Sequence, residues 1–168
     1  LERIGKSGLG DFYGGALARE LVNGVNAAGG VWELADLKAY RVVERAPVKF
    51  TYQNLSITSA SLPSSGGLTL AQTLNILEYT PFASGDPKSR AHYAAEAMRR
   101  AFQDRARYLG DPDFVAAPLE ELQNKNYAAR RAMTIDPNEA TPSSTLGDQP
   151  ELSSSGTNTT HFSVIDSA

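Results

Sequence analysis

Apolar residues recur at the spacing of an α-helix near the start of the chain. Between residues 11 and 28, leucines and valines fall on one helical face. Asp11 is the expected N-cap of this helix, and the Gly-Gly pair at 29–30 is its expected stop. A second, short helix is expected over residues 33–39.

An alternating pattern with β-branched residues follows. Val48–Tyr52 and Leu55–Ser59, separated by two polar residues, predict a β-hairpin that needs other elements to pack on. The next helix is marked by leucines three and four positions apart. It is expected to begin at Ser65 or Gly66 and to end near Glu78.

The clearest helical stretch, rich in Ala, Arg and Glu, covers residues 89–109. Ser89 is the expected N-cap, and Gly110 just past the end is the expected C-cap. Glu96 and Arg100 stand at i,i+4, the spacing of a helical ion pair. We therefore expect a long amphipathic helix on one face of the domain.

The pattern changes after a last short helix expected within residues 126–133. Residues 134–158 are rich in Ser, Thr, Pro, Gly and acidic residues and have no apolar period, which predicts a flexible linker. Alternation returns in residues 159–168, which read as a strand. The predicted divisions are thus 1–133, 134–158 and 159–168, and both chain ends are expected to be cuts within a longer gene product.

Composition narrows the function classes. At 168 residues the chain has the size of one domain, and we expect one unit. A net charge of −3 with no basic stripe argues against nucleic acid as a partner, and no apolar run is long enough to cross a membrane. The absence of cysteine and the presence of only two histidines make a metal site improbable.

Three motifs, in their order along the chain, carry a resemblance to a known family. They are Pro-Ser-Ser-Gly-Gly at 63–67, Asp-Arg-Ala-Arg-Tyr-Leu-Gly-Asp-Pro-Asp-Phe at 104–114, and Thr-Thr-His-Phe-Ser-Val at 159–164. The chain resembles the gamma-glutamyltranspeptidases over nearly its whole length. The resemblance implies an α+β chain that forms part of an N-terminal-nucleophile hydrolase, a four-layer αββα sandwich.

The third motif marks the subunit junction in that family. The resemblance implies autocatalytic cleavage between Asn158 and Thr159, so that residues 1–158 belong to the large subunit and Thr159 begins the small one. Thr159 would be the catalytic nucleophile. Its freed α-amine, with a reference pKa of roughly 8, would serve as the base that an isolated hydroxyl lacks.

The resemblance also implies the substrates. The donor would be glutathione or another γ-glutamyl compound, and the acceptor an amino acid, a peptide or water, with no cofactor. The remainder of the small subunit would be the protein partner, and the location would be periplasmic or secreted. This chain alone is expected to be inactive, because the groups that hold the oxyanion and the donor lie outside it.

Two alternatives stay open: a related acylase or transpeptidase with a different acyl donor, and a non-catalytic structural module. Other motif residues receive structural interpretations. His161 is given no catalytic role, residues 64–67 are read as a helix cap and tight turn, and residues 104–114 as a helix terminus. His92 is expected to be a solvated surface residue.

Overall fold

The computed structural model describes residues 1–147. These residues divide between two compact units, one covering Leu1–Glu44 and one beginning at Arg45. The expectation of a single unit is therefore wrong. Composition indicates only whether a chain can bury a core. The stretch at 40–47, which forms no helix or strand, separates two sets of contacts that apolar spacing alone does not distinguish.

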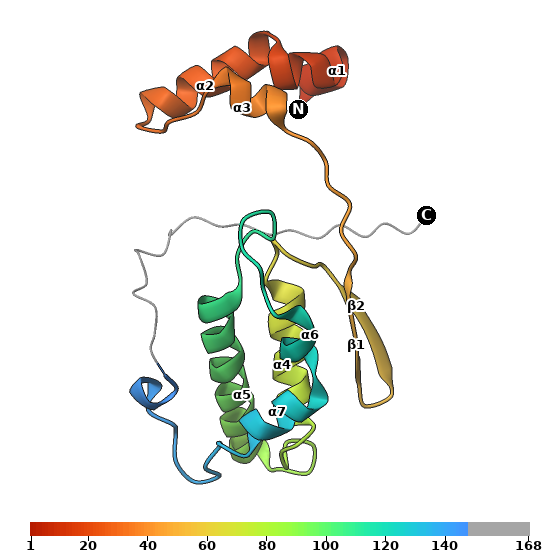
Figure 1. The fold of residues 1–168 in the computed structure, drawn as a ribbon, viewed down its shortest axis with the longest axis vertical. Coiled ribbons are helices and arrows are strands. Elements are labelled where there is room, and N and C mark those ends of the chain that lie inside the picture. The colour runs from red at the N-terminus through yellow and green to blue at the C-terminus, as the bar shows by residue number, and fades with distance from the viewer. Residues whose placement is uncertain (148–168) are drawn as a thin grey trace. The chain divides into compact units, whose positions relative to one another are not determined.

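The first unit consists of three helices, α1 (Glu2–Gly14), α2 (Ala16–Ala27) and α3 (Leu34–Ala39) (Figure 1). The short helix α3 is confirmed. The single helix expected over residues 11–28 is wrong, because the chain breaks at Gly15, which has extended backbone angles.

Asp11 does cap a helix, but from inside the preceding one. Its Oδ1 accepts a hydrogen bond from the backbone N–H of Leu17 in the first turn of α2, at 3.0 Å. A Cβ on Gly15 would lie 2.6 Å from the Cα of Asp11, so the turn between α1 and α2 has no room for a side chain there. The hydrogen bond from the backbone N–H of Leu17, together with the other hydrogen bonds of this carboxylate, lowers the pKa of Asp11.

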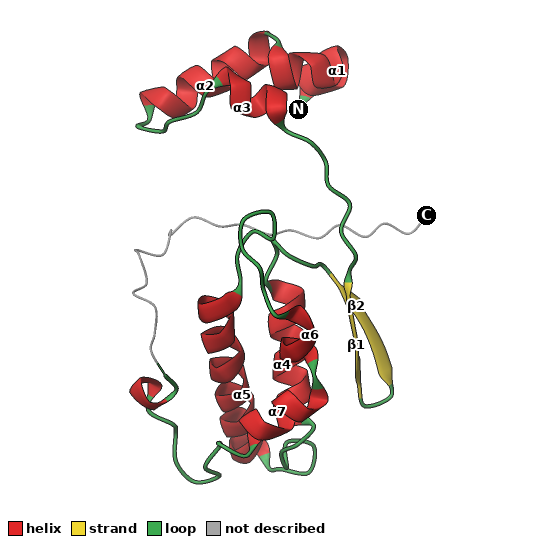
Figure 2. Cartoon of the chain, viewed as in Figure 1, coloured by secondary structure: helices red, strands yellow, loops and turns green. Residues whose placement is uncertain are grey.

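The second unit opens with the predicted hairpin, β1 (Val48–Tyr52) and β2 (Leu55–Ser59), which is confirmed with Val48 opposite Ser59 (Figure 2). Its inward side chains Val48 and Phe50 pack on Ala71 of the next helix. A two-stranded sheet is only marginally stable by itself. Packing on α4 supplies the additional contacts that the sequence predicts the hairpin needs.

Up to residue 147, four helices follow the hairpin: α4 (Gly66–Leu77), α5 (Pro87–Tyr108), α6 (Leu119–Gln123) and α7 (Lys125–Ala132), with a 3₁₀ turn, η1, at Ser143–Thr145. In Figure 1, α4 and α5 lie side by side. Their core combines Ile76 and Leu77 of α4 with Tyr93 and Ala97 of α5. The buried face of α5 is not purely apolar, because Glu96, Arg100 and Asp104 are buried beside these residues while Phe102 is exposed.

Both expected caps of the long helix are wrong. The N-cap is Asp86, whose Oδ1 accepts from the N–H of Ser89 at 2.9 Å, and Pro87 occupies the first helical position. Proline is suited to that position because its missing N–H would have no helical partner there. At the other end the C-cap is Leu109 in extended conformation, so Gly110 does not cap the helix.

Candidate functional site

The two residues predicted to carry the chemistry, Asn158 and Thr159, lie outside the described residues, as does His161. Their assignment as cleavage site and nucleophile stays a prediction. What the structure describes is the chain that leads toward them and the surroundings of the two upstream motifs.

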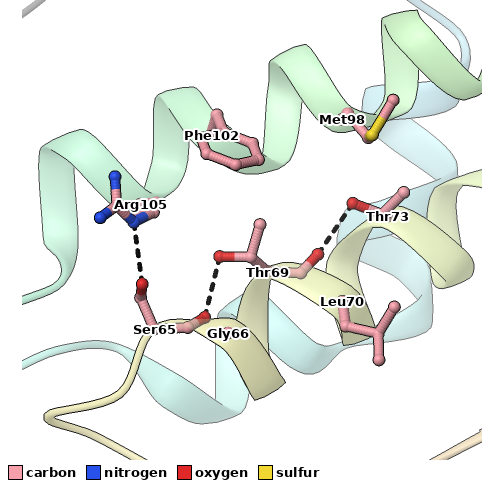
Figure 3. A pocket seen from close by; sticks show the side chains of 8 residues that line it. All are labelled: Ser65, Gly66, Thr69, Leu70, Thr73, Met98, Phe102 and Arg105. Carbon is pink, nitrogen blue, oxygen red and sulfur yellow. Dashed lines mark hydrogen bonds between the residues drawn. The ribbon is translucent and has the colours of Figure 1, made fainter. Parts of the chain in front are cut away.

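The Pro-Ser-Ser-Gly-Gly motif joins the hairpin to α4. Ser65 occupies the N-cap position, yet its hydroxyl does not cap the helix; it accepts a hydrogen bond from Nε of Arg105 on α5 at 2.8 Å (Figure 3). Gly67 lies against the backbone of Ala60, where a Cβ would enter the carbonyl oxygen. The motif therefore fixes the hairpin and α5 against the start of α4, and the structural interpretation holds with a different role for the serine.

A shallow groove of about 300 Å³ runs between α4 and α5 beside this motif. Its apolar lining is visible in Figure 3, where Leu70, Met98 and Phe102 project from the two helices. These side chains are 44%, 45% and 53% exposed. Among its lining residues Arg105 alone is charged, so the groove offers apolar contact and one cation but no general base or nucleophile with a base beside it.

The Asp-Arg motif starts from a buried carboxylate. Asp104, 3% exposed, accepts hydrogen bonds through Oδ2 from Nε2 of Gln72 and from the hydroxyl of Tyr127, both at 2.8 Å, while Arg131 lies 3.5 Å from Oδ1. Burial, and then the bond to this carboxylate, raise the pKa of Tyr127 well above its usual range. Asp104 thus joins α4, α5 and α7, as expected for scaffold.

The predicted Glu96–Arg100 pair forms, with 2.6 Å between Oε2 and Nη1, but it is buried: Glu96 is 1% exposed and Arg100 is fully buried. Burial alone would raise the pKa of Glu96. Hydrogen bonds from Thr141 and Arg100 outweigh it and bring that pKa to about 2. The helical spacing predicts the pair, but nothing in the sequence indicates its further partners, Thr134 and Thr141, which lie 34 residues after Arg100 and 45 residues after Glu96.

His92 lies at the surface as expected, but it also has a protein partner. Its side chain is half-buried, and Nε2 lies 2.7 Å from the carbonyl oxygen of Asp136. This contact again joins α5 to the segment that follows α7.

Within residues 1–147, no group of three or more His, Cys, Asp or Glu side chains could hold a metal ion. No helix in the same range has the length and apolar character needed to span a membrane.

Similar proteins of known sequence and structure identify the family of the chain. A family model described as gamma-glutamyltranspeptidase matches residues 1–168. A glutathione hydrolase proenzyme from a Pseudomonas species is 42% identical over 99% of this chain and 29% of its own length. An acylase ACY 1 proenzyme from another Pseudomonas strain is 41% identical over 80% of this chain and 25% of its own length.

Among solved structures, the gamma-glutamyltranspeptidase of Helicobacter pylori superposes with a TM-score of 0.78 at 39% identity, covering 94% of this chain and 46% of that one. The α+β class is confirmed, and the fold is that of part of an N-terminal-nucleophile hydrolase. The chain spans less than a third of the length of the curated relatives named above. Because the family model matches from the first residue to the last, the chain belongs to the gamma-glutamyltranspeptidase family.

Proposed function

We propose that this chain is part of a γ-glutamyltransferase and glutathione hydrolase that matures by cleaving itself between Asn158 and Thr159. The observation that carries the proposal is the 42% identity to a glutathione hydrolase proenzyme, which extends over 99% of the chain. In this proposal residues 1–133 are the C-terminal part of the large subunit, 134–158 a linker, and 159–168 the start of the small subunit.

The atoms that react in self-cleavage are those of the junction and of one water molecule. The hydroxyl of Thr159 attacks the carbonyl carbon of Asn158, the amide C–N bond breaks, and the acyl group moves to the hydroxyl oxygen as an ester. Water then hydrolyses the ester. The products are a carboxylate on Asn158 and a Thr159 that has a free α-amine and its hydroxyl restored.

Turnover uses the same oxygen. With its own amine as the base, directly or through one water, Thr159 attacks the γ-carbonyl of a donor such as glutathione and releases the amine leaving group. The resulting γ-glutamyl ester passes to water or to the amine of an amino acid or peptide. The steps call for no cofactor, and the oxyanion donors belong to parts of the protein outside this chain. We place the mature enzyme in the periplasm or outside the cell, following the family resemblance.

A second candidate has one specific observation in its favour. An acylase proenzyme is 41% identical over 80% of the chain, so an acyl donor other than a γ-glutamyl compound would use the same nucleophile. The donor is selected by groups that contact its acyl portion, and assays with a γ-glutamyl and a cephalosporin substrate in parallel separate the two functions.

The test uses the full-length parent protein. Purified precursor should yield two fragments without added protease, with Thr159 at the new N-terminus by mass spectrometry, and should then hydrolyse a chromogenic γ-glutamyl anilide. Thr159→Ala should abolish both. Scission at the same bond in Thr159→Ala, or scission elsewhere in the wild type, would remove Thr159 from the mechanism.

A further inference from the structure

One face of α5 carries side chains that bind the segment after α7. We call the four residues His92, Glu96, Arg99 and Arg100 the polar strip, and residues 134–147 the approach segment. The strip residues stand at positions i, i+4, i+7 and i+8 of the helix, the spacing of a single helical face.

Glu96 binds one residue of the approach segment through both of its carboxylate oxygens. Its Oε2 accepts from the hydroxyl of Thr141 at 2.6 Å, and its Oε1 accepts from the backbone N–H of Thr141 at 3.1 Å. The remaining capacity of the carboxylate is used by Arg100 at 2.6 Å and Arg99 at 2.8 Å. Thr141 is thereby held by both its side chain and its backbone.

The two arginines extend the attachment. Arg100 donates from Nε to the hydroxyl of Thr134 at 2.8 Å and from Nη2 to its carbonyl oxygen at 2.7 Å, and also reaches Thr141 Oγ1 at 3.2 Å. Arg99 donates from Nη2 to the hydroxyl of Ser143 at 2.9 Å.

These contacts have a direction. Along α5, His92 meets Asp136, Glu96 meets Thr141, and Arg99 meets Ser143. One turn further on, a Cβ on Gly147 would lie 2.9 Å from Nε2 of Gln103. The approach segment therefore runs along α5 in the same direction as the helix.

Apolar packing contributes little to this arrangement. In the approach segment Ile135 alone packs on the core cluster, and residues 136–140 and 142–145 are exposed. Hydrogen bonds to the strip are therefore the main attachment of residues 136–147. The last of these residues is followed by 11 more, 148–158, before the bond between Asn158 and Thr159.

We propose that the polar strip is a positioning device for self-cleavage: by fixing the approach segment, Glu96 and Thr141 shorten the free chain that must carry the Asn158–Thr159 bond to its cleavage geometry. The inference rests on the proposed function. It assigns Glu96 as a positioning residue, because Glu96 acts on the junction through the chain and touches neither substrate nor reacting atoms.

The size of the effect follows from tether length. The tether is counted as the residues of sequence between the last attached residue and the bond. With the strip intact that count starts after Gly147 and is 11 residues, 148–158; with the strip lost it starts after Ile135 and is 23 residues, 136–158. Local concentration of a tethered group falls roughly as the −3/2 power of tether length, so the lengthening lowers it about threefold. Self-cleavage should slow by up to that factor, while turnover by molecules already cleaved should not change.

The experiment measures the first-order rate of self-cleavage. Full-length precursor is isolated before it has cleaved, and the two fragments are then followed over time by gel electrophoresis and intact-mass spectrometry. Thr141→Val keeps the shape and the backbone bond but removes the hydroxyl, and Glu96→Gln removes the charge that holds both threonine groups. Thr145→Val is the matched control, because Thr145 lies in the same segment and, within residues 1–147, its hydroxyl bonds to the carbonyl of Pro142 and to no residue of the strip. Activity per cleaved molecule is measured for each variant.

We expect Glu96→Gln, which weakens both bonds to Thr141, to slow cleavage by up to about threefold, and Thr141→Val, which keeps the backbone bond, to slow it measurably but less. Thr145→Val and all specific activities should be unchanged. As a second measurement, inserting twelve Gly and Ser residues after Gly147 leaves the strip intact, lengthens the tether to the same 23 residues, and should slow cleavage by a similar factor without lowering the melting temperature.

Wild-type cleavage rates in Thr141→Val or in the insertion variant would overturn the inference, as would a loss of specific activity in proportion to the loss of cleavage. The proposed function fails by a separate result: scission between residues 158 and 159 in Thr159→Ala precursor.

Discussion

Replacing Gly67 by alanine should destabilise the second unit, whereas the same change at the neighbouring Gly66 should not. Both glycines belong to the Pro-Ser-Ser-Gly-Gly motif and lie in the first turn of α4. Their surroundings differ: a Cβ on Gly66 meets only Ser64 Oγ at 3.8 Å, an ordinary contact. A Cβ on Gly67 would enter the carbonyl oxygen of Ala60 and lie 2.9 Å from Ser59 Oγ.

The serine hydroxyl can rotate away, but the carbonyl of Ala60 can move only with the end of the hairpin. Forcing extra carbon into such a contact costs about 1–3 kcal/mol. At Gly66 the alanine restricts the unfolded chain without strain, which stabilises by about 0.4–1 kcal/mol. The two variants should therefore differ by roughly 1.5–4 kcal/mol, on the order of 10 °C in melting temperature for a unit of this size.

Urea unfolding of both variants and the wild type, followed by far-UV circular dichroism, measures this difference. Equal midpoints for Gly66→Ala and Gly67→Ala would refute the close approach of α4 to the hairpin as the reason for the second glycine. A loss of activity in both variants at unchanged stability would instead assign the motif to substrate binding.

Three further outcomes are expected. The pKa of Glu96 is lowered from 4.5 to about 2 in the folded chain. Its contribution to the free energy of unfolding, on the order of 3 kcal/mol, is therefore present above pH 4.5 and lost as pH falls toward 2. Glu96→Gln should flatten the dependence of stability on pH between these values. Tyr127→Phe removes a bond to the Asp104 carboxylate and should cost about 1.5–3 kcal/mol in urea unfolding. The 168-residue chain alone should show no turnover of a γ-glutamyl anilide and should keep its intact mass, because losing even one oxyanion donor typically costs on the order of a hundredfold in rate.

Local patterns predicted local structure well. The hairpin is confirmed. It could be predicted because its pattern, alternating β-branched residues on either side of two polar residues, lies within twelve consecutive residues. The long helix was found by its composition, but its start was placed at Ser89 although the Asp86-Pro87 pair is a strong N-terminal signal. Asp11 was recognised as a capping residue, yet apolar periodicity could not reveal the break at Gly15 that decides which helix it caps.

Contacts between distant segments could not be predicted in this way. The spacing of Glu96 and Arg100 indicated an ion pair, and on a solvated helix face such a pair is worth only a few tenths of a kcal/mol. Its burial depends on Thr134 and Thr141, in a segment whose composition indicated only a linker. The predicted nucleophile Thr159 came from family resemblance alone, since an isolated threonine in an alternating pattern indicates no more than a strand.

The polar character of the contact between α5 and the approach segment has a physical consequence of its own. Apolar residues in place of a buried ion pair are often equally or more stabilising, so stability does not explain why Glu96 and Arg100 are charged. Apolar surfaces, however, tolerate displacement along one another, whereas the two oxygens of Glu96 require an N–H and a hydroxyl on the same residue, as Thr141 provides. A shift of the segment by one residue would present Ala140 or Pro142 instead, leaving a buried carboxylate short of donors at a cost of several kcal/mol. The ion pair therefore selects one register of the approach segment on α5, and with it a fixed count of residues between the helix and the Asn158–Thr159 bond.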